Sequence, residues 1–226
     1  MTRNRGSGVH RKPSGAETSE GIACLPTFLV VEDDAHAGRA FVDLLRDEWP
    51  VMWARSVGEA EAELRDRRFA GVVLDASLPD GSGTALLEAM RGRGDSSPVL
   101  MVTGHFDRAL PDLCHRLDAA CVFKPEVGRD VLHFAERAAT VEARFRAHAG
   151  QVLGRYRRSK QLSPREAELL GLFVVGTPRR ALGRRTGISE NSVKTLVKRM
   201  LNKLDADDLD QAARWVLEDV AKLRLA

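Results

Sequence analysis

The chain has 226 residues, a formal net charge of +3 and a hydrophobic content of 43%. This length exceeds one typical domain and fits two, and the apolar content is sufficient for real cores. The sequence contains no apolar run approaching the roughly 20 residues of a membrane span, and no apolar stretch follows its basic N-terminus as in a secretory signal. We therefore expect a cytoplasmic protein with no membrane partner.

The charge is divided unevenly along the chain. Residues 151–204 contain 13 Lys and Arg against 3 Asp and Glu, a net charge of +10, whereas residues 25–150 contain 15 against 21, a net charge of −6. A basic segment of domain size indicates a polyanionic partner. Nucleic acid is the first candidate.

The cysteines indicate a reducing compartment. The chain has an odd number of cysteines, namely Cys24, Cys114 and Cys121, which argues against a disulfide framework. Their spacing is not that of metal ligands. A redox pair of Cys114 and Cys121 is one interpretation, and burial as small apolar side chains is the one we favour.

In chain order, residues 1–24 are polar and aperiodic, which predicts a disordered tail. Residues 25–150 then alternate short apolar runs with amphipathic stretches, which predicts an α/β doubly wound fold with a parallel five-stranded sheet. The expected strands are Thr27–Val31, Val51–Ala54, Ala70–Leu74, Val99–Val102 and Ala120–Phe123, and the expected helices between them are Ala35–Glu48, Val57–Arg67, Gly83–Arg91 and Phe106–Leu117.

A long Ala- and Arg-rich helix is expected from about Val127 to Arg158, followed by a break near Ser159–Gln161. We place the first domain at residues 25–150, a linker at 151–160 and an all-α domain at 161–226. In that domain Ser163-Pro164-Arg165-Glu166 is a capping box that begins a helix. Gly176 ends this helix, and Thr177-Pro178 starts the next one. Gly187 supplies a tight turn and Ser189 caps a third helix, which predicts a helix-turn-helix.

Polar side chains follow four of the expected strands. Glu32 and Asp33 follow the first, Asp75 the third, Thr103 the fourth and Lys124 the fifth. Ligands of such sheets bind beyond the C-terminal ends of the strands, and crowded carboxylates suit Mg²⁺ with its preference for oxygen ligands. The alternative is that each acid only caps the helix that follows its strand.

This pattern over residues 27–150 resembles the receiver domain of two-component response regulators, a flavodoxin-like fold. The match consists of Glu32-Asp33, of Asp75 with Pro79 and Gly83, of Thr103, and of Lys124-Pro125. The resemblance implies that Asp75 is phosphorylated and that Glu32, Asp33, Asp75 and the Ser77 backbone carbonyl bind Mg²⁺. It also implies that Lys124 and Thr103 contact the phosphoryl group. Cys121 stands where the family usually has an aromatic switch residue, so the switch is expected to differ here.

The third helix of the basic domain has two faces. Val193, Val197, Met200, Leu201 and Leu204 repeat at core spacing, and the opposite face is polar and free of acids after Glu190. Lys, Asn and Thr at such positions suit a helix in the major groove of DNA. An ordinary solvated helix face is the alternative. We predict as DNA-binding residues Asn191, Lys194, Thr195, Lys198, Arg199 and Asn202.

Residues 162–220 resemble the LuxR/NarL-type helix-turn-helix. The match is carried by the segment from Leu162 to Glu166, by Gly176, by Ser192-Val193-Lys194-Thr195 and by Lys203-Leu204. In that family the last helix makes a dimer contact, which the resemblance assigns here to Leu209, Ala213, Val216 and Leu217. A purely internal core role for this helix, expected at Asp207–Leu223, is the alternative.

Together these features predict a DNA-binding transcriptional response regulator, switched by Mg²⁺-dependent phosphorylation of Asp75 by a histidine kinase and dimeric at least when activated. We do not expect a metabolic enzyme. Two alternatives remain: a phosphorylation-independent DNA-binding regulator whose receiver serves dimerisation, motivated by Cys121, and a signalling module whose receiver docks a partner protein.

Overall fold

The structure is a computed structural model that describes residues 26–105 and 107–225. The predicted tail 1–24, which includes Cys24, lies outside the described residues. Within the described part of the chain, no helix has the length and apolar character needed to cross a membrane.

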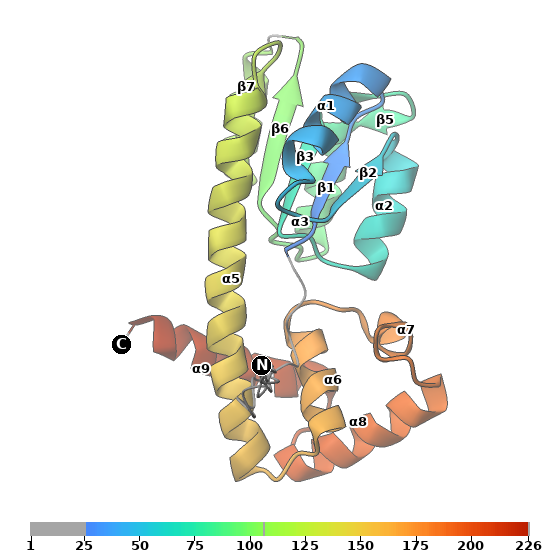
Figure 1. The fold of residues 1–226 in the computed structure, drawn as a ribbon, viewed down its shortest axis with the longest axis vertical. Coiled ribbons are helices and arrows are strands. Elements are labelled where there is room, and N and C mark those ends of the chain that lie inside the picture. Colours follow the sequence, from blue (N-terminus) through green and yellow to red (C-terminus); the bar gives the residue numbers. More distant parts are fainter. Residues whose placement is uncertain (1–25, 106, 226) are drawn as a thin grey trace, which may run out of the picture.

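The N-terminal half is built on a parallel five-stranded sheet (Figure 1). The strand order is β2-β1-β3-β6-β7, with β1 at Phe28–Val31, β2 at Val51–Ala54, β3 at Gly71–Asp75, β6 at Val99–Thr103 and β7 at Ala120–Phe123. Every residue of β1, β3 and β6 is buried, as expected of apolar strands that helices cover on both sides. The predicted fold class is confirmed.

Helices cover both faces of this sheet. On one face α1 (Ala35–Leu45) and α5 (Gly128–Ser159) form a core with the strands, and on the other face α2 (Val57–Asp66), α3 (Gly83–Gly92) and α4 (Ala109–Arg116) form a second core. A short hairpin of β4 (Ser77–Leu78) and β5 (Gly81–Ser82), which the sequence did not indicate, lies between β3 and α3. Helix α4 begins after the predicted position, because the Asp107 carboxylate accepts a hydrogen bond from the Ala109 N–H at 2.9 Å.

The C-terminal half is helical, with α6 at Pro164–Val174, the short η1 at Arg179–Ala181, α7 at Leu182–Thr186, α8 at Glu190–Leu204 and α9 at Leu209–Leu225. Helix α5 runs for 32 residues from the sheet into this unit (Figure 1). Its end contributes Ala149, Val152 and Leu153 to the C-terminal core. The stretch that we assigned to a linker is therefore helical as far as Ser159, and two of its side chains, Val152 and Leu153, are buried. The division of the chain at 151–160 stays a prediction.

Local signals of the C-terminal half are confirmed. Ser163 and Glu166 form the reciprocal capping box, with 2.8 Å between the Ser163 N–H nitrogen and the Glu166 carboxylate. Gly187 ends α7 in the left-handed region at φ 68°, which glycine adopts without steric cost, and Ser189 caps α8.

Glu166 also connects two helices, which leads to a prediction about acid stability. Its carboxylate is 3% exposed and accepts a bond from Lys203 Nζ of α8 at 2.7 Å. Burial acts to raise the pKa of Glu166, but the bonds from Lys203 and Ser163 outweigh it, so that the pKa is lowered. A lowered folded pKa stabilises the protein above the unfolded value of about 4.3, and this stabilisation is lost as pH falls through the folded pKa.

We expect Glu166→Gln to cost about 1 kcal/mol at neutral pH, because water around the partly exposed Lys203 screens the pair. The variant should also show a weaker loss of stability below about pH 4. Urea unfolding followed by circular dichroism at pH 7, 4 and 3 measures both effects. Glu168→Gln, on the same helix in a surface pair with Arg165, is the control and should keep the wild-type pH profile. An identical profile for Glu166→Gln and wild type would refute the assignment.

Candidate functional site

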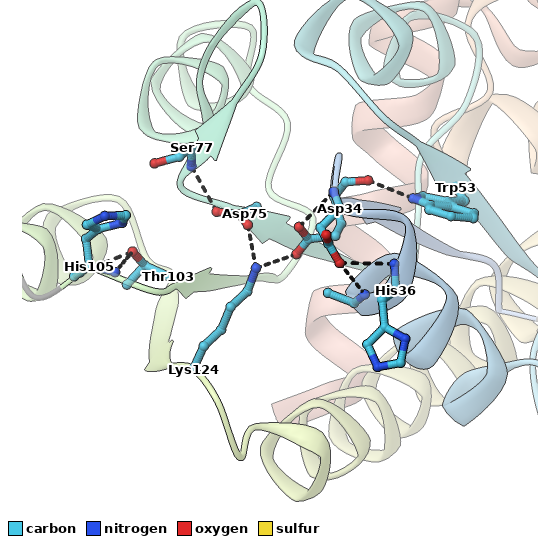
Figure 2. A network of polar contacts seen from close by, with 10 residues as sticks. Asp34, His36, Trp53, Asp75, Ser77, Thr103, His105 and Lys124 are labelled. Atoms are coloured by element: carbon cyan, nitrogen blue, oxygen red, sulfur yellow. Dashed lines mark hydrogen bonds and ion pairs between the residues drawn. The ribbon is translucent and has the colours of Figure 1, made fainter.

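The C-terminal ends of four strands meet at one edge of the sheet (Figure 2). Glu32 and Asp33 follow β1, Asp75 ends β3, Thr103 ends β6 and Lys124 follows β7. Strand-like hydrogen bonds continue one residue past β1 and β7: Glu32 N–H donates to the Ala54 carbonyl at 3.0 Å, and Lys124 N–H donates to the Thr103 carbonyl at 2.8 Å. These bonds fix the backbone from which the side chains project into the site.

Three carboxylates are close together at this edge. Glu32, Asp33 and Asp75 each offer an oxygen, and these oxygens lie within 4.8 Å of one another. Lys124 Nζ lies between two of them, 2.7 Å from Glu32 Oε2 and 2.6 Å from Asp75 Oδ2. Glu32 and Asp75 are buried, so their repulsion is only weakly screened and the cluster requires nearby cations.

The pKa values in the cluster reflect this crowding. Burial raises the pKa of Glu32, an effect that the bond from Lys124 opposes and the charge of Asp75 reinforces. Burial by itself acts to lower the pKa of Lys124, but the bonds to Asp75 and Glu32 outweigh it and raise that pKa. The ammonium is therefore held in its charged form beside the two carboxylates.

The Asp75 side chain is oriented by the loop that follows it. Ser77 N–H donates to Asp75 Oδ1 at 2.9 Å, and Gly83 N–H donates to the Ala76 carbonyl at 3.0 Å. A Cβ at position 83 would overlap the Asp75 carbonyl oxygen. The structure therefore explains why the motif contains glycine here: the start of α3 packs directly against the backbone of Asp75.

The alternative interpretation of the acids was that they only cap helices. In the structure this role belongs to a different acid, Asp34. Asp34 caps α1 by accepting bonds from His36 N–H at 3.0 Å and Ala37 N–H at 2.8 Å (Figure 2). These bonds lower the pKa of Asp34, with the bond from Ala37 as the largest cause. Asp75 and Glu32 instead bond to Lys124, so they are directed into the common site.

Two residues at the end of β2, Trp53 within the strand and Arg55 just after it, were missed by the sequence reasoning. The Trp53 indole Nε1 donates to the Glu32 carbonyl at 2.8 Å, and Arg55 Nη2 donates to the Asp33 carbonyl at 2.9 Å. The Arg55 guanidinium carbon lies 5.7 Å from the centre of the Trp53 ring. The two donors hold the backbone of both acidic residues. No local pattern marks them, because the contact arises from the pairing of β2 with β1.

Two expected switch residues do not contact Asp75 in this structure. The Thr103 hydroxyl donates to the His105 carbonyl at 3.2 Å and accepts from the His105 N–H at 3.1 Å. Cys121 is partly buried and packs against the core on the α4 side of the sheet, which includes Cys114. Burial, together with Cys121, raises the pKa of the Cys114 thiol to about 11. The roles of Thr103 and Cys121 stay predictions.

The face of α8 assigned to DNA is accessible. Asn191, Lys194, Thr195, Lys198, Arg199 and Asn202 are all exposed, while Val193, Val197, Met200 and Leu204 are buried. Arg179 of η1 lies with Lys194, Lys198 and Asn202 around a hollow on this surface. The exposed polar face of α8 therefore extends onto η1, where Arg179 adds another positive charge.

The predicted dimer residues of α9 differ in exposure. Leu209, Ala213 and Val216 are buried in the C-terminal core, whereas Leu217 is 40% exposed. Helix α9 thus packs on its own unit through one face, and its role in a dimer stays a prediction centred on Leu217.

Two family models match the chain in its two halves. Residues 28–134 match the response regulator receiver domain, and residues 160–216 match the luxR family of bacterial regulatory proteins. The chain is a response regulator with a receiver domain and a luxR-type output domain. The receiver model covers the acidic site, and the luxR model covers the helix-turn-helix with α8. Such a regulator is a two-component, DNA-binding regulator of transcription.

Several known proteins are similar to this chain over most of its length. The nitrate/nitrite response regulator protein NarL of Escherichia coli is 27% identical over 86% of this chain and 96% of its own length. The DNA-binding transcriptional activator DevR/DosR of Mycobacterium tuberculosis is 29% identical over 84% and 93%. Among solved structures, the response regulator StyR matches 86% of this chain and 99% of its own at 25% identity and a TM-score of 0.49.

Proposed function

We propose that Mg²⁺-dependent phosphorylation of Asp75 by a histidine kinase switches this response regulator, which then binds DNA through α8 as a homodimer. The observation that carries the proposal is the convergence of three carboxylates and Lys124 on one sheet edge, with Asp75 held by Lys124 at 2.6 Å. Asp75 is 7% exposed, so it borders a site and is not an ordinary surface acid.

The residues at this edge fit Mg²⁺. Three closely spaced carboxylate oxygens from Glu32, Asp33 and Asp75 are hard ligands of the kind this ion prefers. The Ser77 backbone carbonyl is proposed as the fourth protein ligand. The ion, when bound, supplies positive charge that stabilises the transferring phosphoryl group.

The side chains of the receiver then have separate tasks. Asp75 is the acceptor, and once phosphorylated it would carry a charge of about −1.5 to −2 in place of the single negative charge of its carboxylate. Lys124 is proposed to pair with the phosphoryl oxygens, and its distance of 2.6 Å from Asp75 Oδ2 supports this role. Thr103 is proposed to exchange its bonds with His105 for a bond to the phosphoryl group.

The test is a DNA-binding titration by fluorescence anisotropy on genomic fragments, with and without the phosphoryl mimic beryllofluoride. We expect tighter binding and a higher oligomeric state with the mimic. Unchanged affinity and oligomeric state would overturn the switch and favour a phosphorylation-independent DNA binder. That alternative is supported by Cys121 at the switch position and by the orientation of Thr103 toward His105. Absence of DNA binding in both states would favour a receiver that docks a partner protein.

Lys194→Ala tests the DNA face of α8 directly. Because Lys194 is exposed on that face, we expect its loss to weaken binding by about five- to tenfold and to lower the salt-dependence slope by about one. Lys222→Ala on α9, where the lysine pairs with Asp219 at 2.9 Å, is the matched control and should bind normally. An unchanged slope for Lys194→Ala would refute the assigned face.

A further inference from the structure

The two acidic residues after β1 leave the sheet at a point where the backbone of β2 no longer supplies donors. The Glu32 N–H still donates to the Ala54 carbonyl of β2 at 3.0 Å. If the parallel pair continued, the next bond would run from the Ser56 N–H to the Glu32 carbonyl. Ser56 instead caps α2, where its hydroxyl accepts a bond from the Glu59 N–H at 3.1 Å. The carbonyl groups of Glu32 and Asp33 therefore require donors from side chains.

The side chains of Trp53 and Arg55 supply these two donors. Figure 2 shows the Trp53 indole directed at the end of β1, where its Nε1 donates to the Glu32 carbonyl at 2.8 Å. Arg55 Nη2 donates to the Asp33 carbonyl at 2.9 Å. Because the two residues are two positions apart along an extended backbone, their side chains lie on the same side of it. The Arg55 guanidinium carbon is 5.7 Å from the centre of the indole ring, so the two donors form one stacked pair.

Helix α1 leaves space for this indole. Gly38 lies on α1, and a Cβ at that position would overlap the ring of Trp53. The ring also packs against the core that α1 and α5 form with the strands. The indole is therefore held between the strand that carries it and the helix that follows the acidic pair.

The two bonds restrain the backbone on both sides of the Asp33 Cα. A peptide unit is planar, so a bond to its carbonyl oxygen restrains the orientation of the whole unit. The bond from Trp53 holds the unit between Glu32 and Asp33, and the bond from Arg55 holds the unit between Asp33 and Asp34. The backbone dihedral angles of Asp33 in turn determine how its carboxylate lies relative to the other two carboxylates of the site.

We propose that Trp53 and Arg55 are positioning residues that set the affinity of the acidic site for Mg²⁺. This inference rests on the proposed function, in which Glu32, Asp33 and Asp75 bind the ion. Mg²⁺ demands a nearly ideal octahedral arrangement of oxygen ligands, so a small displacement of one carboxylate weakens its binding. Groups that orient metal ligands typically change metal affinity by roughly 10- to 100-fold when they are removed. Each of the two side chains acts through the backbone carbonyl of a ligand residue.

Calorimetric titration of the full chain with Mg²⁺ tests the role of the indole. Trp53→Phe keeps an aromatic ring and removes the Nε1–H donor, so we expect the affinity for Mg²⁺ to fall about tenfold. Trp49→Phe is the matched control, because Trp49 packs against Phe28 with 5.3 Å between ring centres, and it should bind Mg²⁺ like wild type. Equal Mg²⁺ affinity of the Trp53 variant and wild type would overturn the role of the indole.

Removal of Arg55 tests the pair through the sign of the effect. Arg55 is exposed, so Arg55→Met should fold. By charge alone, the loss of a cation near the acids should strengthen Mg²⁺ binding. Loss of the donor to Asp33 should weaken it, and we expect a net fall of about fivefold. Tighter or unchanged binding would refute positioning by Arg55, and Arg46→Met, in a surface pair with Asp43 at 3.0 Å, is the control.

Labelling by acetyl phosphate at increasing Mg²⁺ concentrations separates positioning from a general structural defect. Trp53→Phe and Arg55→Met should need about tenfold and about fivefold more Mg²⁺ for half-maximal labelling, while their rates at saturating Mg²⁺ stay within about twofold of wild type. A lower saturating rate with an unchanged Mg²⁺ requirement would overturn the inference and leave the proposed function intact. Absence of Mg²⁺ binding by the wild-type protein would instead overturn the proposed function and this inference with it.

Discussion

Asp75→Asn should abolish labelling of the protein by radioactive acetyl phosphate. The amide lacks the nucleophilic carboxylate oxygen that now lies 2.6 Å from Lys124, and it removes one of the three acidic ligands proposed for Mg²⁺. We expect the rate of labelling to fall by a factor of about 100 or more, because an amide at this position cannot act as the nucleophile. Labelling is measured on the intact chain with saturating Mg²⁺, together with a circular dichroism spectrum to verify folding.

Asp34→Asn is the matched control, because Asp34 is a neighbouring acid that caps α1 and bonds to His36 and Ala37. Asparagine is an equally good capping residue, so labelling should remain near the wild-type rate. Undiminished labelling of the Asp75 variant would show that another residue is the acceptor. Loss of labelling in both variants would show that the effect is not specific to Asp75.

Gly83→Ala should destabilise the receiver domain by about 3 kcal/mol. A Cβ at this position would overlap the Asp75 carbonyl oxygen and approach the Ala76 Cα at 3.2 Å. Both obstacles are backbone atoms next to the acceptor, so α3 or the end of β3 must move. The variant should therefore also slow phosphorylation under conditions where it remains folded. Urea unfolding and acetyl phosphate labelling measure the two effects.

Gly92→Ala supplies the comparison within the same helix. Gly92 is the last residue of α3, and no atom lies within 4 Å of an added Cβ. Replacing a helical glycine with alanine at an unobstructed site should stabilise the domain by about 0.5–1 kcal/mol. Equal changes in stability for the two substitutions would contradict the close approach of α3 to Asp75.

Much of the fold could be predicted because its signals are local. The apolar runs at Val51–Ala54 and Ala120–Phe123 have the bounds observed for β2 and β7. The Ser163 capping box and the turn at Gly187 depend on contacts within a few residues, so the sequence reveals them directly. The hairpin of β4 and β5 was missed because its strands have two residues each, too few to show a period.

The candidate site was only partly predictable. Strand order explains why Glu32, Asp33, Asp75 and Lys124 meet, since all lie at or just after the C-terminal ends of parallel strands and project at one edge. The orientation of Thr103 toward His105, by contrast, is a choice between side-chain conformers that the sequence does not encode locally. The support of Glu32 and Asp33 by Trp53 and Arg55 depends on the pairing of β2 with β1.

The sequence by itself determined most of the helices and strands, the order of the two domains and the identity of the acids at the sheet edge, because periodicity, caps and strand ends act over short distances. The tertiary structure alone decided that α5 continues into the C-terminal core and that Asp66 holds Arg180 and Arg184. The two residues of each pair are separated in the sequence by 114 positions (Asp66 and Arg180) or 118 positions (Asp66 and Arg184). Contacts over such separations depend on how whole helices pack, so no local sequence pattern predicts them.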